Sequence, residues 1–254
     1  MVTAVSDNRT DRTERTYPSH RWGFGAFLLV EALLLASAAL VSVLLAGDEP
    51  AESIPVRHVL IGTIAPTGIA ALAALLITVV RGNGPMTDLR LEWRWDDVKI
   101  GLKFGALGLV VTTIGVAVWT NLVGEENAQS AIGTLVAEKP MSVRAALVMF
   151  CYLWLIGPIC EEIIYRGLLW GAVERLHWGS ERWGRWAAFV LTTGLFAVSH
   201  LEPLRTSLLL VIAIPIGLAR LVTGRLLGSV VAHQVNNFLP AVAILLPALG
   251  VMTI

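Results

Sequence analysis

The sequence predicts an all-α membrane protein, a polytopic bundle of about eight transmembrane helices. Of its 254 residues, 56% are hydrophobic and only 15% are charged, whereas a soluble domain carries about 25% charged residues. The apolar residues gather in long runs, and a helix that spans a bilayer needs ~20 of them in succession. The net charge of zero offers nucleic acid no electrostatic attraction, so we expect no nucleic-acid partner.

The apolar runs give the predicted helices in chain order. They cover 23–46, 58–80, 98–122, 143–173, 184–201, 205–222, 225–239 and 240–254. The last two are short and are divided by Pro240, so seven spans followed by a re-entrant or broken end is the alternative. Residues 1–22 are polar and lack an apolar core, which predicts a disordered cytoplasmic arm and not a signal peptide. Residues 23–254 are expected to form a single transmembrane domain.

The distribution of basic residues predicts the orientation. The basic segments are the N-terminal arm, the loops at 81–99 and 174–185, and the turn at 220–225 with Arg220 and Arg225. The intervening loops at 47–57 and 123–142 are acidic. Because cytoplasmic loops carry the excess of Lys and Arg, we expect the N-terminus in the cytoplasm.

Ionisable side chains within the predicted spans are the candidates for a functional site. Each costs about 2.5–3.5 kcal/mol at the centre of a membrane helix, so a function is the default hypothesis for its presence. The candidates are Glu31, Glu161, Glu162, Arg166, His200 and His233, accompanied by the neutral Asn236 and Asn237.

The stretch EEIIYR holds two adjacent carboxylates and a guanidinium. Glu162 and Arg166 are four residues apart, so they share a helix face and are predicted to form an ion pair. Glu161 points about 100° away around the helix and is left without this partner. An unpaired intramembrane carboxylate suits a general base or a metal ligand. The alternative is a buried ion-pair network that only fixes helix packing.

Two further motifs place histidines on helix faces. In FAVSH, Phe196 and His200 are four residues apart, and in HQVNN the same spacing joins His233 to Asn237. Either histidine could be a hydrogen-bonded core residue, and the amides could simply link helices. At 1.5 Å per residue, however, both motifs reach the depth of Glu161, which predicts one shared polar site.

This set of side chains suits the activation of water. A carboxylate and a histidine can hold and deprotonate water, while a second histidine and an amide can stabilise an oxyanion. Alternatively, Glu161, His200 and His233 could bind Zn²⁺ or another divalent metal, a ligand set that also activates water. The sequence leaves the cofactor open, with no cofactor as the third possibility. It contains neither HExxH nor GxSxG.

The three motifs, in this order on three apolar segments, resemble those of the CPBP (CAAX protease and bacteriocin-processing, Abi) family of intramembrane endopeptidases, which includes the type II CAAX prenyl proteases. The resemblance covers about residues 143–240, the expected catalytic core. It implies peptide-bond hydrolysis in the membrane, with Glu161 and His200 activating water, and His233 and Asn237 stabilising the oxyanion. Supporting roles are implied for Glu162, Arg166 and Phe196. The family is labelled as metalloproteases, although a metal-free mechanism is also argued for it.

The leading hypothesis is therefore a CPBP-type intramembrane (metallo)endopeptidase in the plasma membrane of a prokaryote. Its expected partners are the lipid bilayer and a membrane-associated or prenylated peptide or protein substrate. One alternative is a noncatalytic scaffold or bacteriocin-immunity factor with the same fold. Another is a proton- or cation-coupled transporter with Glu31 and Glu161 as relay sites. The sequence does not identify the substrate, its side of entry, the role of Glu31 or the oligomeric state.

Overall fold

The computed structural model describes residues 21–48, 50, 53–137, 139 and 141–251, and every regular element in this part of the chain is helical. The predicted arm 1–22 thus lies outside the described residues, apart from Arg21 and Trp22. The prediction of an all-α protein is confirmed.

Six uninterrupted long helices and one composite helix make up the bundle. The uninterrupted helices are α1 (Phe24–Leu45), α2 (Val56–Arg81), α4 (Trp95–Val123), α10 (Glu181–Ser199), α11 (Thr206–Thr223) and α12 (Leu226–Ala248). The composite helix joins α7 (Val143–Cys151), η2 (Tyr152–Ile156), α8 (Gly157–Glu162), η3 (Ile163–Leu169) and α9 (Trp170–Glu174), with η2 and η3 in π-helical conformation. The short helices are α3 (Pro85–Asp88), α5 (Glu125–Ala128) and α6 (Ala131–Ala137).

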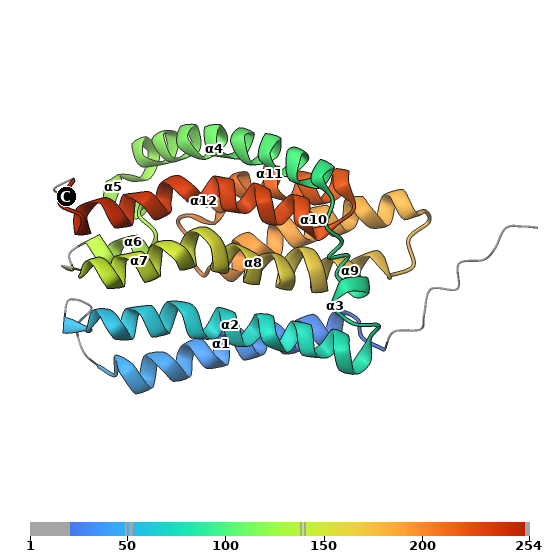
Figure 1. The fold of residues 1–254 in the computed structure, drawn as a ribbon, viewed down its shortest axis with the longest axis horizontal. Helices are drawn as coiled ribbons and strands as arrows, with labels where there is room; N and C mark the ends of the chain where they lie inside the picture. The colour runs from blue at the N-terminus through green and yellow to red at the C-terminus, as the bar shows by residue number, and fades with distance from the viewer. Residues whose placement is uncertain (1–20, 49, 51–52, 138, 140, 252–254) are drawn as a thin grey trace, which may run out of the picture.

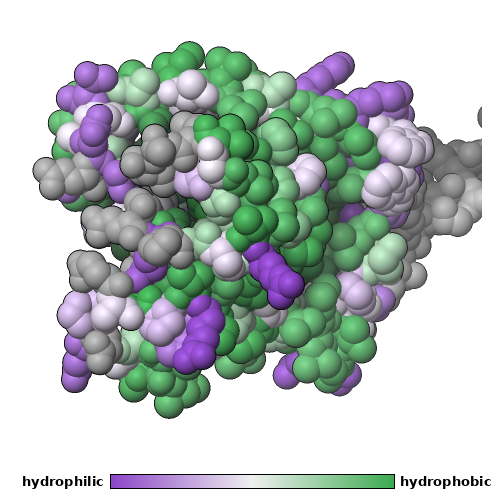
Figure 2. All heavy atoms as spheres, turned by 60° about the vertical axis from the view of Figure 1, so that its left-hand side comes forward, coloured by the Kyte–Doolittle hydropathy of each residue, from purple (hydrophilic) through white to green (hydrophobic). Residues whose placement is uncertain are grey.

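Six helical segments of the described chain are long and apolar enough to cross a membrane, namely α1, α2, α4, the composite helix, α11 and α12. Helix α10 is outside this set, because its first turns carry Glu181, Arg182 and Arg185. The predicted count of about eight spans is therefore not confirmed. Large hydrophobic side chains lie exposed along these helices, and Figure 2 shows them over much of the middle of one face. The chain is an integral membrane protein.

The predicted break at Pro240 is wrong. Residues 225–239 and 240–254 were expected to form two spans, but α12 runs from Leu226 to Ala248 and contains Pro240 and Pro247. A proline removes one backbone hydrogen bond and disturbs the preceding turn. Membrane helices tolerate this when neighbouring groups satisfy the freed backbone. Here α12 packs on α4, α11 and the composite helix, and these contacts hold its two halves in one helix.

The composite helix lies at the centre of the arrangement. In Figure 1 the hairpin of α1 and α2 lies on one side of it, and α12 lies on the other side, followed by α4. Helix α11 contacts α4, α10 and α12. The composite helix is thus covered by both the N-terminal and the C-terminal helices, and its middle is buried.

Helices α4 and α12 approach closely because α4 presents glycines to α12. A Cβ atom on Gly101 would lie 2.7 Å from the carbonyl oxygen of Gly228, and one on Gly105 would lie 2.6 Å from Cβ of Val235. Small residues spaced by four allow such contacts between membrane helices. The pair brings the His233 segment of α12 against α4.

We expect Gly105→Ala to destabilise the protein by about 1–3 kcal/mol, because overpacking forces neighbouring groups to move. Thermal unfolding in detergent micelles measures this effect. Gly68→Ala in α2 is the matched control, since a Cβ there meets nothing within 4 Å. An equal melting temperature for Gly105→Ala and the wild type would show that the two helices are not in this contact.

The basic loops meet at one end of the bundle. Arg90 forms an ion pair with Glu174 at 2.9 Å, and Arg225 forms one with Asp97 at 2.6 Å. The hydrogen bonds from Arg225 to Asp97 raise the pKa of the Arg225 guanidinium. These contacts tie the 81–99 loop to the composite helix and to the start of α12. The segments predicted to share one side of the membrane therefore do lie together.

Candidate active site

The predicted ion pair in the composite helix is confirmed. Glu162 at the end of α8 and Arg166 in η3 are both fully buried, and Arg166 Nη1 lies 3.0 Å from Glu162 Oε1. The guanidinium carbon of Arg166 also lies 4.5 Å from the centroid of the Phe196 ring, so this cation is held by a carboxylate and an aromatic face. Glu161, by contrast, forms no ion pair with Arg166 in the described part of the chain, and its side chain is 26% exposed. The two neighbouring carboxylates thus have different environments.

His233 of α12 joins both glutamates. Its Nδ1 lies 2.9 Å from Oε1 of Glu162, and its Nε2 lies 3.6 Å from Oε2 of Glu161. Since a carboxylate accepts hydrogen bonds, we assign the proton of a neutral His233 ring to Nδ1. Nε2 is then an acceptor that faces Glu161. The separation of 3.6 Å is one that a water molecule can bridge.

Phe196 connects the histidines of α10 and α12. Its ring centroid lies 4.7 Å from that of His200 and 5.7 Å from that of His233. His200 caps the C-terminal end of α10, is exposed, and places Nδ1 2.7 Å from the carbonyl oxygen of Phe196. Because a carbonyl only accepts, Nδ1 of His200 carries a proton. The structure thus brings the FAVSH motif to the glutamates through Phe196, while His233 is the histidine with a contact to Glu161.

The side-chain amides of α12 form hydrogen bonds to two different neighbours, the composite helix and α4. Asn237 donates from Nδ2 to the carbonyl oxygen of Leu153 in η2 at 3.3 Å, and Gln234 donates to that of Leu155 at 3.3 Å. Asn236 points the other way and accepts a hydrogen bond of 2.8 Å from Thr112 of α4. Sequence reasoning separated Asn237 from Asn236 correctly but did not single out Gln234.

The side chains present do not assemble the predicted metal ligands. Among the described residues, no group of three His, Cys, Asp or Glu side chains is arranged to hold a metal ion. Glu161 and His233 are neighbours, but His200 contacts the Phe196 ring and carbonyl instead of completing the set. This arrangement does not fit Glu161, His200 and His233 as joint ligands.

Glu31 of α1 lies beside the site, at a place that the sequence did not resolve. Ser199, next to His200, donates a hydrogen bond of 3.3 Å to Glu31 Oε1. The buried Tyr165 of η3 interacts with both Glu31 and Ser199. Its ring also lies 5.4 Å from that of Phe196. Helix α1 therefore contributes a carboxylate to the surroundings of Phe196, and only its intramembrane charge signalled this in the sequence.

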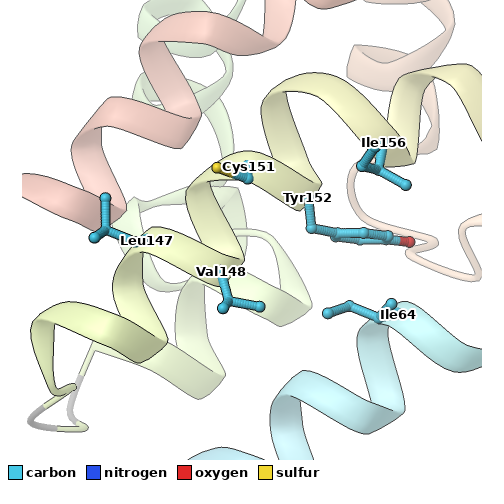
Figure 3. Close-up of a pocket in the computed structure, with 6 residues that line it drawn as sticks. All are labelled: Ile64, Leu147, Val148, Cys151, Tyr152 and Ile156. Carbon is cyan, nitrogen blue, oxygen red and sulfur yellow. The ribbon is translucent and has the colours of Figure 1, made fainter.

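An open apolar groove runs beside the composite helix. It has a volume of about 370 Å³ and is lined by Ile64, Leu147, Val148, Cys151, Tyr152 and Ile156. Figure 3 shows Ile64 of α2 across from Val148 and Tyr152. The Tyr152 hydroxyl donates to the carbonyl oxygen of Thr63 at 3.0 Å, and Tyr152 also interacts electrostatically with Glu161. The groove is thus an apolar surface near the less buried carboxylate.

Comparison with known families matches the part of the chain that holds the site. Residues 143–239 match the family model described as type II CAAX prenyl endopeptidase, Rce1-like. This segment includes the composite helix, α10, α11 and the first part of α12, and hence all three motifs. No curated protein and no solved structure matches the chain.

Proposed function

We propose that the chain, whose residues 143–239 match the Rce1-like type II CAAX prenyl endopeptidase family, hydrolyses a peptide bond of a membrane-associated or prenylated substrate. The observation that carries the proposal is the contact of His233 with two unequal glutamates. Glu162 is neutralised by Arg166, whereas Glu161 is partly exposed. The site therefore pairs a fixed histidine with an accessible base.

In this proposal Glu161 is the general base. The hydrolytic water donates one hydrogen bond to Glu161 Oε2 and one to Nε2 of His233, so its oxygen lone pair points to the scissile carbonyl carbon. Glu161 takes a proton from the water as the carbon–oxygen bond forms, and it later gives this proton to the departing amine. Glu162 holds His233 through Nδ1 and so keeps Nε2 as an acceptor. The role of water partner, implied for His200 by the resemblance, passes to His233.

Stabilisation of the oxyanion is assigned to Asn237 and to His200 in its imidazolium form, in which Nε2–H can donate to the oxyanion while Nδ1–H donates to the Phe196 carbonyl. A side-chain amide nitrogen carries two N–H groups, so Asn237 can bind Leu153 and still offer a second donor. His200 closes the end of α10 beside Phe196 and is exposed, so the substrate can reach it. The apolar part of the substrate is assigned to the groove at Tyr152, which lies within electrostatic reach of Glu161.

We further propose that the N-terminus is cytoplasmic, in the plasma membrane of a prokaryote. The clustering of Arg90, Arg225 and their loops at one end supports this orientation by the positive-inside rule. The family match does not favour the scaffold or immunity alternative or the transporter alternative.

Comparative proteomics of membranes tests the proposed function. Cells with the wild-type chain are expected to contain new peptide termini that are missing from cells with Glu161→Ala at equal membrane levels. New termini that lie within, or directly after, an apolar terminal segment of a membrane protein would identify the substrate class. The same set of termini in both cell lines would refute the proposal.

A further inference from the structure

Two π-helical turns interrupt the composite helix, one on each side of Glu161 and Glu162. In an α-helix the N–H of Gly157 would bind the carbonyl of Leu153, and that of Trp170 would bind the carbonyl of Arg166. Here Gly157 donates to Tyr152, and Trp170 donates to Tyr165 and Gly167. Each π turn therefore leaves one carbonyl oxygen, that of Leu153 or that of Arg166, without its α-helical N–H donor. Pro158 cannot replace the lost donor at Leu153, since proline has no N–H.

Side chains from two other helices reach these two carbonyls. Asn237 of α12 donates to Leu153 at 3.3 Å, and Arg220 Nε of α11 donates to Arg166 at 3.0 Å. A buried carbonyl without a partner is unfavourable, particularly inside a membrane protein. Both π turns are thus satisfied in the same way, and one of the two donors belongs to the proposed site.

Arg220 is otherwise unexplained. Its side chain is 1% exposed, and its guanidinium carbon lies 5.2 Å from the centroid of the Trp170 ring. The sequence placed it where the predicted helix 205–222 overlaps the basic turn 220–225, and α11 continues to Thr223, so Arg220 lies inside the helix. A buried guanidinium is costly and calls for a specific partner. Its Nε donates a hydrogen bond to the Arg166 carbonyl, which η3 leaves without a helical donor.

We infer that Arg220 is a positioning residue, which holds the π turn of η3 and thereby sets the direction of Arg166. The backbone carbonyl of Arg166 accepts a hydrogen bond from Arg220, and the Arg166 side chain binds Glu162. Glu162 in turn binds His233, which faces Glu161. The register of η3 thus decides whether Glu162 meets His233. The catalytic consequence rests on the proposed function, whereas the structural link between Arg220 and η3 does not.

Hydrogen–deuterium exchange tests the structural link in the full chain in detergent micelles. Arg220→Met removes the donor, and we expect faster exchange for peptides from 163–174 with unchanged exchange in α1 and α2. Arg225→Met is the matched control, because it removes the hydrogen bonds of 2.6 Å to Asp97 but does not touch η3. Wild-type exchange of 163–174 in Arg220→Met, or an equal increase in Arg225→Met, would overturn the inference.

Kinetics test the positioning role with a farnesylated, internally quenched peptide that ends in a CAAX sequence. We expect Arg220→Met to lower kcat about ten- to a hundredfold, since small displacements of catalytic groups have effects of this size, with KM within about twofold. Arg220→Lys is expected to recover part of kcat, because its ammonium group can donate to the same carbonyl. Arg225→Met should keep the wild-type kcat. A higher KM with an unchanged kcat in Arg220→Met, or no recovery of kcat in Arg220→Lys, would contradict the positioning role.

The two measurements separate the possible failures. If the wild type does not cleave the peptide, the proposed function is at fault for this substrate, and the exchange of 163–174 still tests Arg220. If Arg220→Met does not fold, Arg220→Lys and Arg220→Gln carry the test. The long lysine side chain can still donate to the Arg166 carbonyl and should keep the exchange of 163–174 near the wild-type rate, whereas the shorter glutamine cannot reach it and should exchange faster in 163–174 only. Wild-type exchange in Arg220→Gln would overturn the inference.

Discussion

Glu161→Gln is expected to lower kcat for a cleaved peptide by about 10³-fold, within the range that general-base catalysis contributes. Glutamine keeps the size of the side chain and its ability to accept a hydrogen bond from water, but it cannot take the proton. Because Glu161 makes no ion pair with Arg166 in the described structure and is 26% exposed, its replacement should leave the fold intact. Initial rates over a range of peptide concentrations, with melting temperatures of both proteins, provide the measurement.

Glu31→Gln is the matched control for this experiment. Both residues are glutamates within predicted membrane spans, but Glu31 contacts Ser199 and not His233. We expect it to lower kcat no more than about tenfold. Equal losses in the two variants would mean that any intramembrane carboxylate near Phe196 is required, which would favour the relay expected of a transporter. Full activity of Glu161→Gln would remove Glu161 as the base.

The second large effect is expected on stability, at the buried ion pair. Glu162→Ala leaves the guanidinium of Arg166 buried without a carboxylate, which should cost about 3–5 kcal/mol. It also deprives Nδ1 of His233 of its acceptor. Thermal unfolding in micelles, followed by circular dichroism, should show a markedly lower melting temperature. Asp96→Ala, which breaks the exposed pair with Lys99, is the control and should change it little.

A double replacement separates the structural and functional roles of this pair. Glu162→Met with Arg166→Met removes both charges and keeps apolar volume, and such exchanges are often neutral or stabilising. We therefore expect the double variant to melt near the wild-type temperature. It should nevertheless be inactive, because His233 is no longer oriented by Glu162. Wild-type activity in the double variant would show that the pair serves packing alone, which was the alternative reading of EEIIYR.

The predictable part of the site followed from spacing on a helix. Residues four apart share a face, and this rule paired Glu162 with Arg166, Phe196 with His200, and distinguished Asn237 from Asn236. The estimate of depth in the membrane then brought the three motifs to one layer, and the contacts of His233 and Phe196 agree with that estimate. These properties depend only on helix geometry and hydropathy, so they can be derived from short stretches of sequence.

The partners of each polar group were beyond the reach of the sequence. Which histidine faces Glu161 depends on how α10 and α12 rotate against the composite helix, and the structure gives His233. Arg220 was counted as a basic residue of the turn at 220–225, although it fills a buried position in α11. Glu31 and Ser199 are 168 positions apart in the chain, and no local pattern connects them.

By itself, then, the sequence determined the all-helical membrane class, the ends of most long helices and the three motifs, since hydrophobic runs and residue spacing act locally. The tertiary structure alone decided the π turns beside the glutamates, the continuity of α12 through Pro240 and the link from Arg220 to Glu161. Helix α12 stays continuous through its packing on α4, α11 and the composite helix, and each π turn leaves a backbone carbonyl that a donor from another helix satisfies. The donors come from helices far along the chain, and only packing brings them within hydrogen-bond distance.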